Sequence, residues 1–184
     1  MNRPLEGDEL RDRRLARAAR DGDLDAFSAL VSPYRRPFFN AAYRIIHHPQ
    51  DSEDVTQIAL LRVYEKLDRY DSGRPFFRWA FKIVVREALR WVERESPRTR
   101  PLDQGSASAS EETPSSWGSV AAHLQLEKAL SLLGPDQRAV IALRHLHGFS
   151  YAEIAEILDV AEKTVRSRLF EARKKLRSLL AESR

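Results

Sequence analysis

The residues best suited to bind a ligand are basic side chains close to the C-terminus. Positions 161–177 hold seven Lys and Arg residues against two acidic ones, a local balance of +5 in a chain whose net charge is only +4. Val165, Leu169 and Ala172 recur at helical spacing and form one apolar stripe. Most of the basic side chains, with Ser167 and Phe170, then lie on the other sides of the predicted helix. Such a surface is suited to bind a polyanion.

A short helix and a tight turn must position this basic helix. Ser150 and Glu153 have the spacing of a capping box, in which each side chain accepts from the other residue's backbone N–H. This predicts a helix that starts at about Tyr151 and ends before Asp159. Two helices joined by a tight turn, the second of them basic, are typical of a helix-turn-helix, whose second helix enters the major groove of DNA. A protein-binding helical hairpin is the alternative.

A second basic stripe lies further upstream, within residues 76–95. Arg78, Lys82, Arg86 and Arg90 follow one another at four-residue steps, beside Trp79 and other aromatic residues. Cations interleaved with aromatic rings suit single-stranded DNA, whose phosphates meet the cations while unpaired bases stack. The alternative is a core helix with an ordinary solvated cationic face, and the stripe alone does not separate the two interpretations.

A helix predicted to open near Asp51 or Ser52 carries a third candidate surface. Val55, Ala59, Val63 and Leu67 can form its inner stripe. Asp54, Gln57 and Leu61 then occupy more exposed positions, together with Ile58 or Leu60. A mixture of polar and aliphatic side chains can dock a partner helix, or it can be a solvated face with scattered apolar residues.

Histidines and carboxylates before this helix could be mistaken for a metal site. They are His47, His48, Asp51, Glu53 and Asp54. Adjacent histidines at a helix end point in divergent directions, and carboxylates at a helix start have a capping explanation. The chain also has no cysteine. We therefore expect no metal, no cofactor and no catalytic residues, and hence a protein that is not an enzyme.

The distribution of apolar and charged residues along the chain indicates where in the cell the protein is found. No apolar run approaches the length of a membrane span, and the first residues are charged throughout, without the apolar middle of a signal peptide. We expect a cytoplasmic protein that does not insert into membranes.

Between Leu24 and Ile46 the apolar residues keep a helical period that Pro33 and Pro37 interrupt, which predicts two helical pieces or one kinked helix.

The whole pattern predicts an all-α protein, with two small helical domains joined by a flexible linker. Ser, Pro and Gly are frequent between the two domains, and no apolar period is present there. The predicted parts are a charged N-terminal segment (1–22), a first domain (23–95), the linker (96–119) and a second domain containing the helix-turn-helix (120–182).

The chain resembles the extracytoplasmic-function (ECF) type of bacterial RNA polymerase sigma factor. The stretch LLGPDQRAVIALRHLHGFSYAEIAEILDVAEKTVRSRLFEARKKL is similar to sigma region 4, which in that family reads the −35 promoter element. The stretches DSEDVTQIALLRVYEKLDRYD and FRWAFKIVVREALRWVER are similar to sigma region 2, which binds the polymerase and captures the −10 element as the strands separate. The resemblance implies core RNA polymerase and promoter DNA as partners, with an anti-sigma factor as a candidate third partner.

The resemblance also implies roles for individual residues. Polymerase docking falls on Asp54, Gln57 and Leu61. Binding of the −10 element falls on Arg78, Trp79, Lys82, Arg86 and Arg90. Reading of the −35 element falls on Lys163, Thr164, Arg166, Ser167, Arg168, Phe170 and Arg173. One departure is Arg86, which stands where many relatives carry an Asn that holds a flipped −10 base.

A helix-turn-helix regulator of the LuxR type is the main alternative. Such regulators usually carry an α/β sensor domain upstream of the DNA-binding hairpin. Residues 24–92 show helical periods and no alternating strand pattern, which favours the sigma factor.

Overall fold

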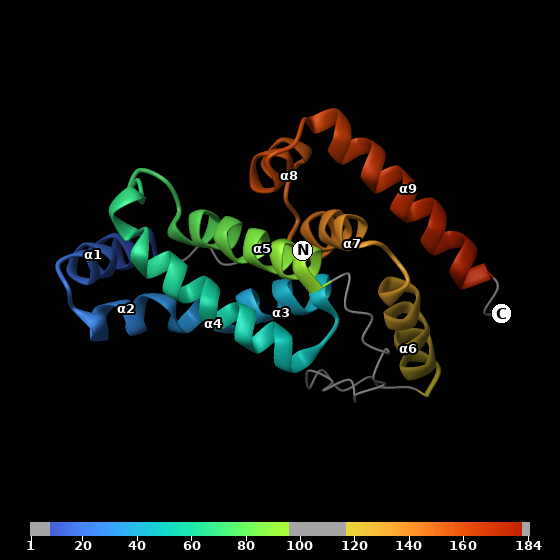
Figure 1. The fold of residues 1–184 in the computed structure, drawn as a ribbon, viewed down its shortest axis with the longest axis horizontal. Helices are drawn as coiled ribbons and strands as arrows, with labels where there is room; N and C mark the ends of the chain where they lie inside the picture. The colour runs from blue at the N-terminus through green and yellow to red at the C-terminus, as the bar shows by residue number, and fades with distance from the viewer. Residues whose placement is uncertain (1–7, 96–116, 182–184) are drawn as a thin grey trace.

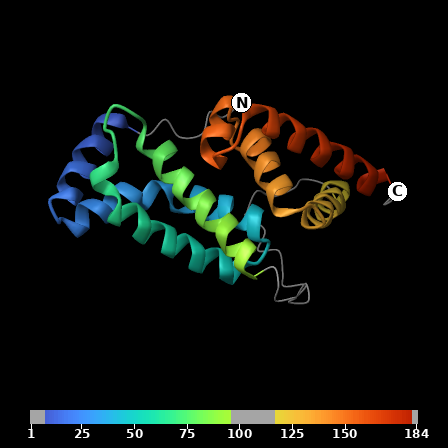
Figure 2. The same ribbon diagram turned by 45° about the horizontal axis from the view of Figure 1, so that its top comes forward.

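The structure is a computed structural model that describes residues 8–95 and 117–181, and the side chains of residues 117–123 are not described. Within these ranges the chain is helical and contains no β-strand, which confirms the all-α prediction. The helices form two groups, one before and one after the undescribed residues 96–116. Figures 1 and 2 show these groups side by side.

The first group consists of α1 to α5, built around aromatic side chains. Its helices are α1 (Glu9–Arg20), α2 (Leu24–Val31), α3 (Arg35–Ile46), α4 (Pro49–Glu65) and α5 (Phe76–Glu95), with 3-10 turns at Ser32–Tyr34 and Leu67–Arg69. Phe38 of α3 is fully buried, and its ring stacks on Phe77 of α5 at 5.7 Å between centroids. Tyr34 and Phe81 complete this cluster, which fixes α5 against α3.

The prolines between Leu24 and Ile46 divide this stretch into two helices, as the first alternative predicted. α2 ends at Val31, a 3-10 turn contains Pro33, and α3 begins at Arg35. Pro37 falls in the first turn of α3, where a backbone N–H has no partner within the helix. Its missing N–H therefore costs the helix no hydrogen bond.

The predicted start of α4 near Asp51 or Ser52 was wrong, because the helix begins at Pro49. His48 is the N-cap, and its Nδ1 accepts from the backbone N–H of Asp51 at 3.3 Å. Pro49 occupies the first helical position, which suits its fixed φ and its missing N–H.

The N-terminal charged segment contains α1, which packs on the rest of the first group. The Asp12 side chain on α1 is buried and accepts a hydrogen bond from the Tyr34 hydroxyl. Ala16 and Ala19 are also buried, and Arg20 donates to the backbone carbonyls of Leu67 and Tyr70. α1 is therefore anchored by both apolar and polar contacts.

The second group contains the helix-turn-helix. Its elements are α6 (Trp117–Ser131), α7 (Pro135–Ile141), a π-helical turn at Ala142–Leu146, α8 (Tyr151–Leu158) and α9 (Glu162–Ala181). Asp159 ends α8 in the left-handed conformation, with φ 59° and ψ 46°, which Asp tolerates better than most residues. Ile154, Val165 and Leu169 are almost completely buried between α8, α9 and α7.

The two groups share one continuous buried cluster. α3 packs against α7, and α5 packs against α8. Phe81 of α5 lies 5.5 Å, between ring centroids, from Phe149, which is itself only 4% exposed. We call this packing the closed arrangement.

Among the helices in residues 8–95 and 117–181, none is both long and apolar enough to cross a membrane.

Candidate functional site

The outer surface of α9 presents the side chains predicted to read DNA. Val165, Leu169 and Ala172 are buried against α7 and α8, which turns the opposite side of the helix to solvent. Arg166 and Ser167 are exposed, and Phe170 is 65% exposed. Against the residues that the structure describes, this aromatic ring is left mostly in water on a basic helix, so it is available to contact a partner.

A surface groove of about 700 Å³ runs between α8 and α9. Tyr151 lines it from α8, and from α9 come Phe170 and several of the basic residues, namely Arg166, Arg173, Lys174 and Arg177. The guanidinium of Arg166 lies 5.8 Å from the centre of the Tyr151 ring and donates to Glu162 at 2.6 Å. These contacts orient Arg166 along the groove while leaving the side chain largely exposed.

The other residues predicted for the −35 element differ in how they are held. Lys163 is exposed, and Thr164 is half-buried. Arg173 is exposed and contacts the His145 ring nitrogen at 3.2 Å. Arg168 is half-buried and pairs with Asp136 of α7 at 2.6 Å. Arg168 therefore ties α9 to α7, whereas Lys163 and Arg173 are free to meet phosphates.

The capping box predicted for α8 is confirmed. Glu153 accepts from the backbone N–H of Ser150 at 2.8 Å, and the Ser150 hydroxyl accepts from the backbone N–H of Glu153 at 3.2 Å. Partial burial acts to raise the pKa of Glu153, but these hydrogen bonds and the nearby Arg78 outweigh it and hold the pKa below its usual value. The carboxylate is thus charged at neutral pH.

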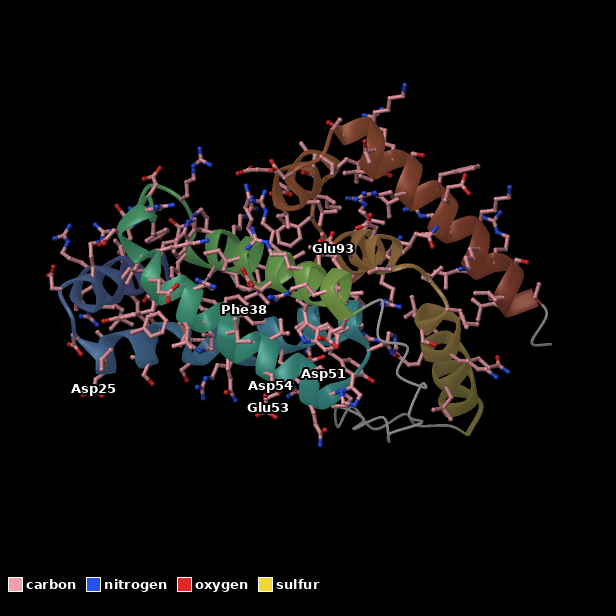
Figure 3. All side chains as sticks on the ribbon, viewed as in Figure 1. Asp25, Phe38, Asp51, Glu53, Asp54 and Glu93 are labelled. Atoms are coloured by element: carbon pink, nitrogen blue, oxygen red, sulfur yellow. The ribbon has the colours of Figure 1, made fainter. Side chains whose placement is uncertain are left out.

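The outward face of α4 carries the residues predicted to dock polymerase. Asp54, Gln57 and Leu61 are all exposed, and Leu61 is 64% exposed. Ile58, not Leu60, completes the face, because Leu60 is buried. Asp54 projects from the side of α4 that faces away from α5 (Figure 3). Two exposed aliphatic side chains one turn apart, beside Asp and Gln, form a surface suited to bind another protein.

The basic side chains of α5 are placed differently from those of α9, because most of them face α8. Arg78 pairs with Glu153, and Arg86 donates to the Ile157 carbonyl at 3.0 Å. Arg90 pairs with Glu87 of its own helix at 2.8 Å. Trp79 is half-buried against the rings of Tyr70 and Phe76.

His48 and Asp51, two of the residues considered and rejected as a metal site, have structural roles. His48 caps α4 and contacts the Asp51 carboxylate at 2.9 Å. Burial, with a smaller contribution from Arg138, lowers the pKa of His47 to about 4. Among the residues that the structure describes, no group of three or more His, Asp and Glu is placed to hold a metal ion.

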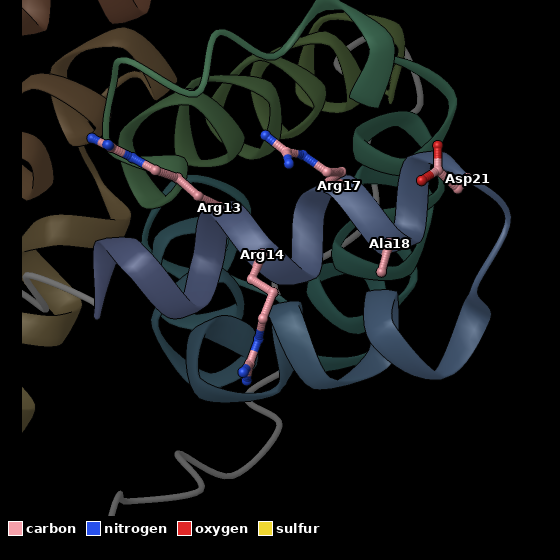
Figure 4. A pocket seen from close by; sticks show the side chains of 5 residues that line it. All are labelled: Arg13, Arg14, Arg17, Ala18 and Asp21. Atoms are coloured by element: carbon pink, nitrogen blue, oxygen red, sulfur yellow. The ribbon is translucent and has the colours of Figure 1, made fainter.

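Reasoning from the sequence missed a cationic surface on α1. Arg13, Arg14 and Arg17 project from this helix around a shallow hollow of about 460 Å³ (Figure 4). Arg13 pairs with Glu9 one turn earlier. The signal was present, because ELRDRRLARAAR places its arginines opposite an alanine stripe, but the segment was interpreted only as charged.

Both groups of helices match known families. Residues 30–98 match the family described as Sigma-70 region 2, and residues 123–176 match the family described as Sigma-70, region 4. Together these matches cover more than half of the chain. The first runs from the end of α2 through α5, and the second from within α6 to within α9.

Similar proteins extend over nearly the whole chain. The ECF RNA polymerase sigma-E factor of Escherichia coli (strain K12) is 31% identical over 179 residues, which cover 90% of this chain and 92% of that protein. The ECF RNA polymerase sigma factor SigW of Bacillus subtilis (strain 168) is 25% identical over 183 residues, which cover 94% and 98%.

Two solved structures share the fold. CnrH, in complex with the cytosolic domain of CnrY, gives a TM-score of 0.67 at 28% identity, covering 95% of this chain and 99% of that one. The sigma factor RpoE of Bartonella quintana, in complex with the anti-sigma factor NepR, gives 0.66 at 26% identity, covering 88% and 100%.

Proposed function

The chain belongs to the ECF RNA polymerase sigma factors, which direct promoter-specific transcription by RNA polymerase, and we propose how its surfaces divide that work. α4 docks core polymerase through Asp54, Gln57 and Leu61. α5 binds the −10 element as the strands separate, and α9 reads the −35 element. The chain supplies binding and positioning, and the polymerase supplies the chemistry.

The exposure pattern of α9 is the observation that carries this proposal. One side of the helix is buried in the core, and the other presents Arg166, Ser167 and Phe170 beside a groove lined by cations. Arg166 can form paired hydrogen bonds with a guanine edge in the major groove, and Phe170 can contact a thymine methyl group. Lys163 and Arg173 flank them and can neutralise phosphates, which makes affinity fall steeply with salt.

The face of α4 supports the docking role because it leaves two aliphatic side chains exposed to water. Leu61 and Ile58 are 64% and 43% exposed, with Asp54 and Gln57 beside them. Burying two such side chains against a partner helix yields about 25 cal/mol for each Å² removed from water. The polar neighbours then set the register of the complex.

For α5, support comes from its cationic and aromatic content. Arg78, Lys82 and Arg86 lie one helical turn apart, so they can follow a phosphate backbone. Trp79 packs against Tyr70 and Phe76, so we assign it the role of supporting this face from below. Arg90 lies further along the same helix and is exposed.

We further propose regulation by an anti-sigma factor in the cytoplasm. A similar structure, RpoE of Bartonella quintana, was solved with the anti-sigma factor NepR, and it covers most of this chain. The exposed face of α4 and the groove beside α9 would both be accessible to such a partner.

Separating polymerase binding from initiation tests this division of work. Arg166→Ala should leave the affinity for core polymerase unchanged and lower initiation at a dependent promoter by about fivefold to 150-fold, because one base contact contributes about 1–3 kcal/mol. Asp54→Ala with Gln57→Ala should weaken core binding instead. Arg36→Ala, which removes an exposed cation from α3, serves as a matched control and should change neither step. Loss of the same step in both test variants would refute the proposal.

A further inference from the structure

The acidic face of α8 lies against the basic face of α5. Glu153, Glu156 and Asp159 follow one another along α8 at three-residue steps, and Arg78, Lys82 and Arg86 follow along α5 at four-residue steps. Arg78 pairs with Glu153, Lys82 lies 3.8 Å from Glu156, and Arg86 lies 3.5 Å from Asp159. The two rows therefore meet in order, cation to carboxylate.

Two further contacts extend this match. Arg74, just before α5, lies 3.6 Å from the Glu156 carboxylate. Arg86 also donates from Nε to the carbonyl of Ile157 at 3.0 Å, so it holds the C-terminal end of α8 by two groups at once. Negative charge at a helix C-terminus favours such a cation. Among the three cations of this row, Arg86 is thus the one that contacts the end of α8 through two different groups.

Apolar and polar contacts hold the groups together on either side of these ion pairs. The Phe81 ring packs edge-on against His147 at 4.7 Å between centroids, and Phe149 is buried beside it. Arg138 of α7 donates to the carbonyl of Ile45 at 2.8 Å, and Arg44 of α3 pairs with Glu127 of α6. Ion pairs between exposed side chains are weak alone, so these buried contacts stabilise the closed arrangement and the ion pairs set its register.

The closed arrangement covers one predicted surface and leaves the other two open. Leu61 of α4 and Phe170 of α9 are both about two-thirds exposed in it. The row Arg78, Lys82 and Arg86 is the surface that α8 occupies. Core polymerase can therefore reach α4 before the groups separate, whereas a −10 strand must compete with α8 for Arg78, Lys82 and Arg86.

We propose that α8 acts as an intramolecular mimic of the −10 strand. Its three carboxylates pair with the cations that would otherwise bind phosphates, so in the free chain α8 competes with single-stranded DNA for α5 until the groups separate. This inference rests on the proposed role of α5 in binding the −10 element. It also gives Arg86 a role, since the shorter side chain of an Asn at that position could not reach both the Asp159 carboxylate and the Ile157 carbonyl.

Removing two of the carboxylates tests the proposal on the full-length chain. Glu156→Gln with Asp159→Asn keeps side-chain shape, spares the capping box at Glu153, and leaves Asn at a left-handed position that it tolerates. The matched control, Glu53→Gln with Glu65→Gln, changes net charge equally on exposed positions of α4. Thermal unfolding of each variant establishes that the helices are intact.

Two measurements report on the closed arrangement. The chain has no cysteine, so fluorophores can be attached through Asp25→Cys on α2 and Ala152→Cys on α8, both exposed positions, and energy transfer between them measures closure. Binding is measured with a fluorescent single-stranded 12-mer from the non-template strand of a promoter that the holoenzyme uses. The α8 variant should show lower energy transfer and bind the 12-mer about threefold to tenfold more tightly than the control, because each exposed ion pair contributes modestly to closure.

The outcomes distinguish this inference from the function on which it rests. Unchanged energy transfer and unchanged 12-mer binding in the α8 variant would overturn the mimic. Lost energy transfer without tighter binding would overturn the masking of DNA. Initiation by holoenzyme carrying Lys82→Gln tests α5 separately, because normal initiation there would refute the −10 role itself, whereas impaired initiation would leave that role standing whatever α8 does.

Discussion

Lowering the pH should open the closed arrangement, because two half-buried histidines favour it only in their neutral form. His47 lies at the end of α3 and His147 lies between α7 and α8, and each has a pKa lowered to about 4. Burial is the main cause for both. Arg138 and Arg44 add to the effect at His47, Glu127 opposes it there, and Arg44 adds to it at His147.

Contacts across the closed arrangement produce this burial. The Phe81 ring of the first group covers His147, and Arg138 of the second group approaches His47. Among the described residues, Nε2 of His47 is buried without a hydrogen-bond partner, so a protonated ring would leave a charged donor unpaired. Separating the groups exposes both rings to water and returns each pKa toward 6.5.

The sign and size of the effect follow from the two pKa values. A histidine whose pKa is lowered in the closed arrangement favours that arrangement fully above pH 6.5, and this contribution is lost as the pH falls from 6.5 toward 4. From pH 7.5 to 5.5 the loss is about 1 kcal/mol for each ring, after a reduction for partial solvent access. Two rings together shift the equilibrium between closed and open forms about 30-fold.

Energy transfer between labels at Asp25→Cys and Ala152→Cys, recorded from pH 7.5 to 5.5, measures this shift. His47→Gln with His147→Gln, carrying the same labels, is the control, because Gln is polar but does not titrate. Glu153 has a lowered pKa and stays charged over this range, so loss of its ion pair does not mimic the effect. Constant energy transfer in the labelled chain, or the full pH response in the Gln variant, would refute the reasoning.

Three further predictions address individual residues. Phe170→Ala should lower the preference for the −35 sequence severalfold with no change in melting temperature, because the ring is 65% exposed; a fall in melting temperature would show that it packs instead. Tyr34→Phe should lower the free energy of unfolding by about 1–3 kcal/mol in urea, since it removes the donor to the buried Asp12 carboxylate. Arg11 also donates to the Asp12 carboxylate, at 3.2 Å, and a neutral result would mean that this contact alone satisfies Asp12. Ser150→Ala should cost about 1 kcal/mol by the same measurement, through loss of the α8 cap, and a change below about 0.3 kcal/mol would contradict that role.

Local features of the fold could be predicted well from the sequence. The Ser150–Glu153 capping box needs only a three-residue spacing, and the structure contains both of its hydrogen bonds. The stripe of Val165, Leu169 and Ala172 likewise sets which side of α9 is buried, through the period of the helix alone. A pattern within one helix can be interpreted from the sequence alone, because the geometry of the helix fixes where its residues lie relative to one another.

Helix boundaries were less predictable, since several residues can act as a cap. Asp51 and Ser52 are better caps on average than histidine, yet His48 caps α4 because Pro49 fits the first helical position. Ser52 instead donates from its hydroxyl to the carbonyl of His48. Which residue caps α4 depended on Pro49, whose effect on the start of the helix did not enter the prediction.

Contacts between residues far apart in the chain lay beyond sequence reasoning. Arg78, Lys82 and Arg86 could be recognised as a basic stripe, but nothing in their spacing indicates that α8 lies on them. The burial of Asp12 under Tyr34 is a similar case, because a charged segment at a chain end gives no sign of a partner 22 residues away. Such pairings depend on the packing of whole helices.

Binding of the purified chain to core RNA polymerase without a sigma factor, followed by transcription from a random promoter library, is the most direct test of the central claim. The prediction is tight binding to core and initiation only at promoters that share two sequence elements at a fixed spacing. Specific binding of the chain alone to duplex DNA, with no binding to core, would contradict the proposed division of work between α4, α5 and α9.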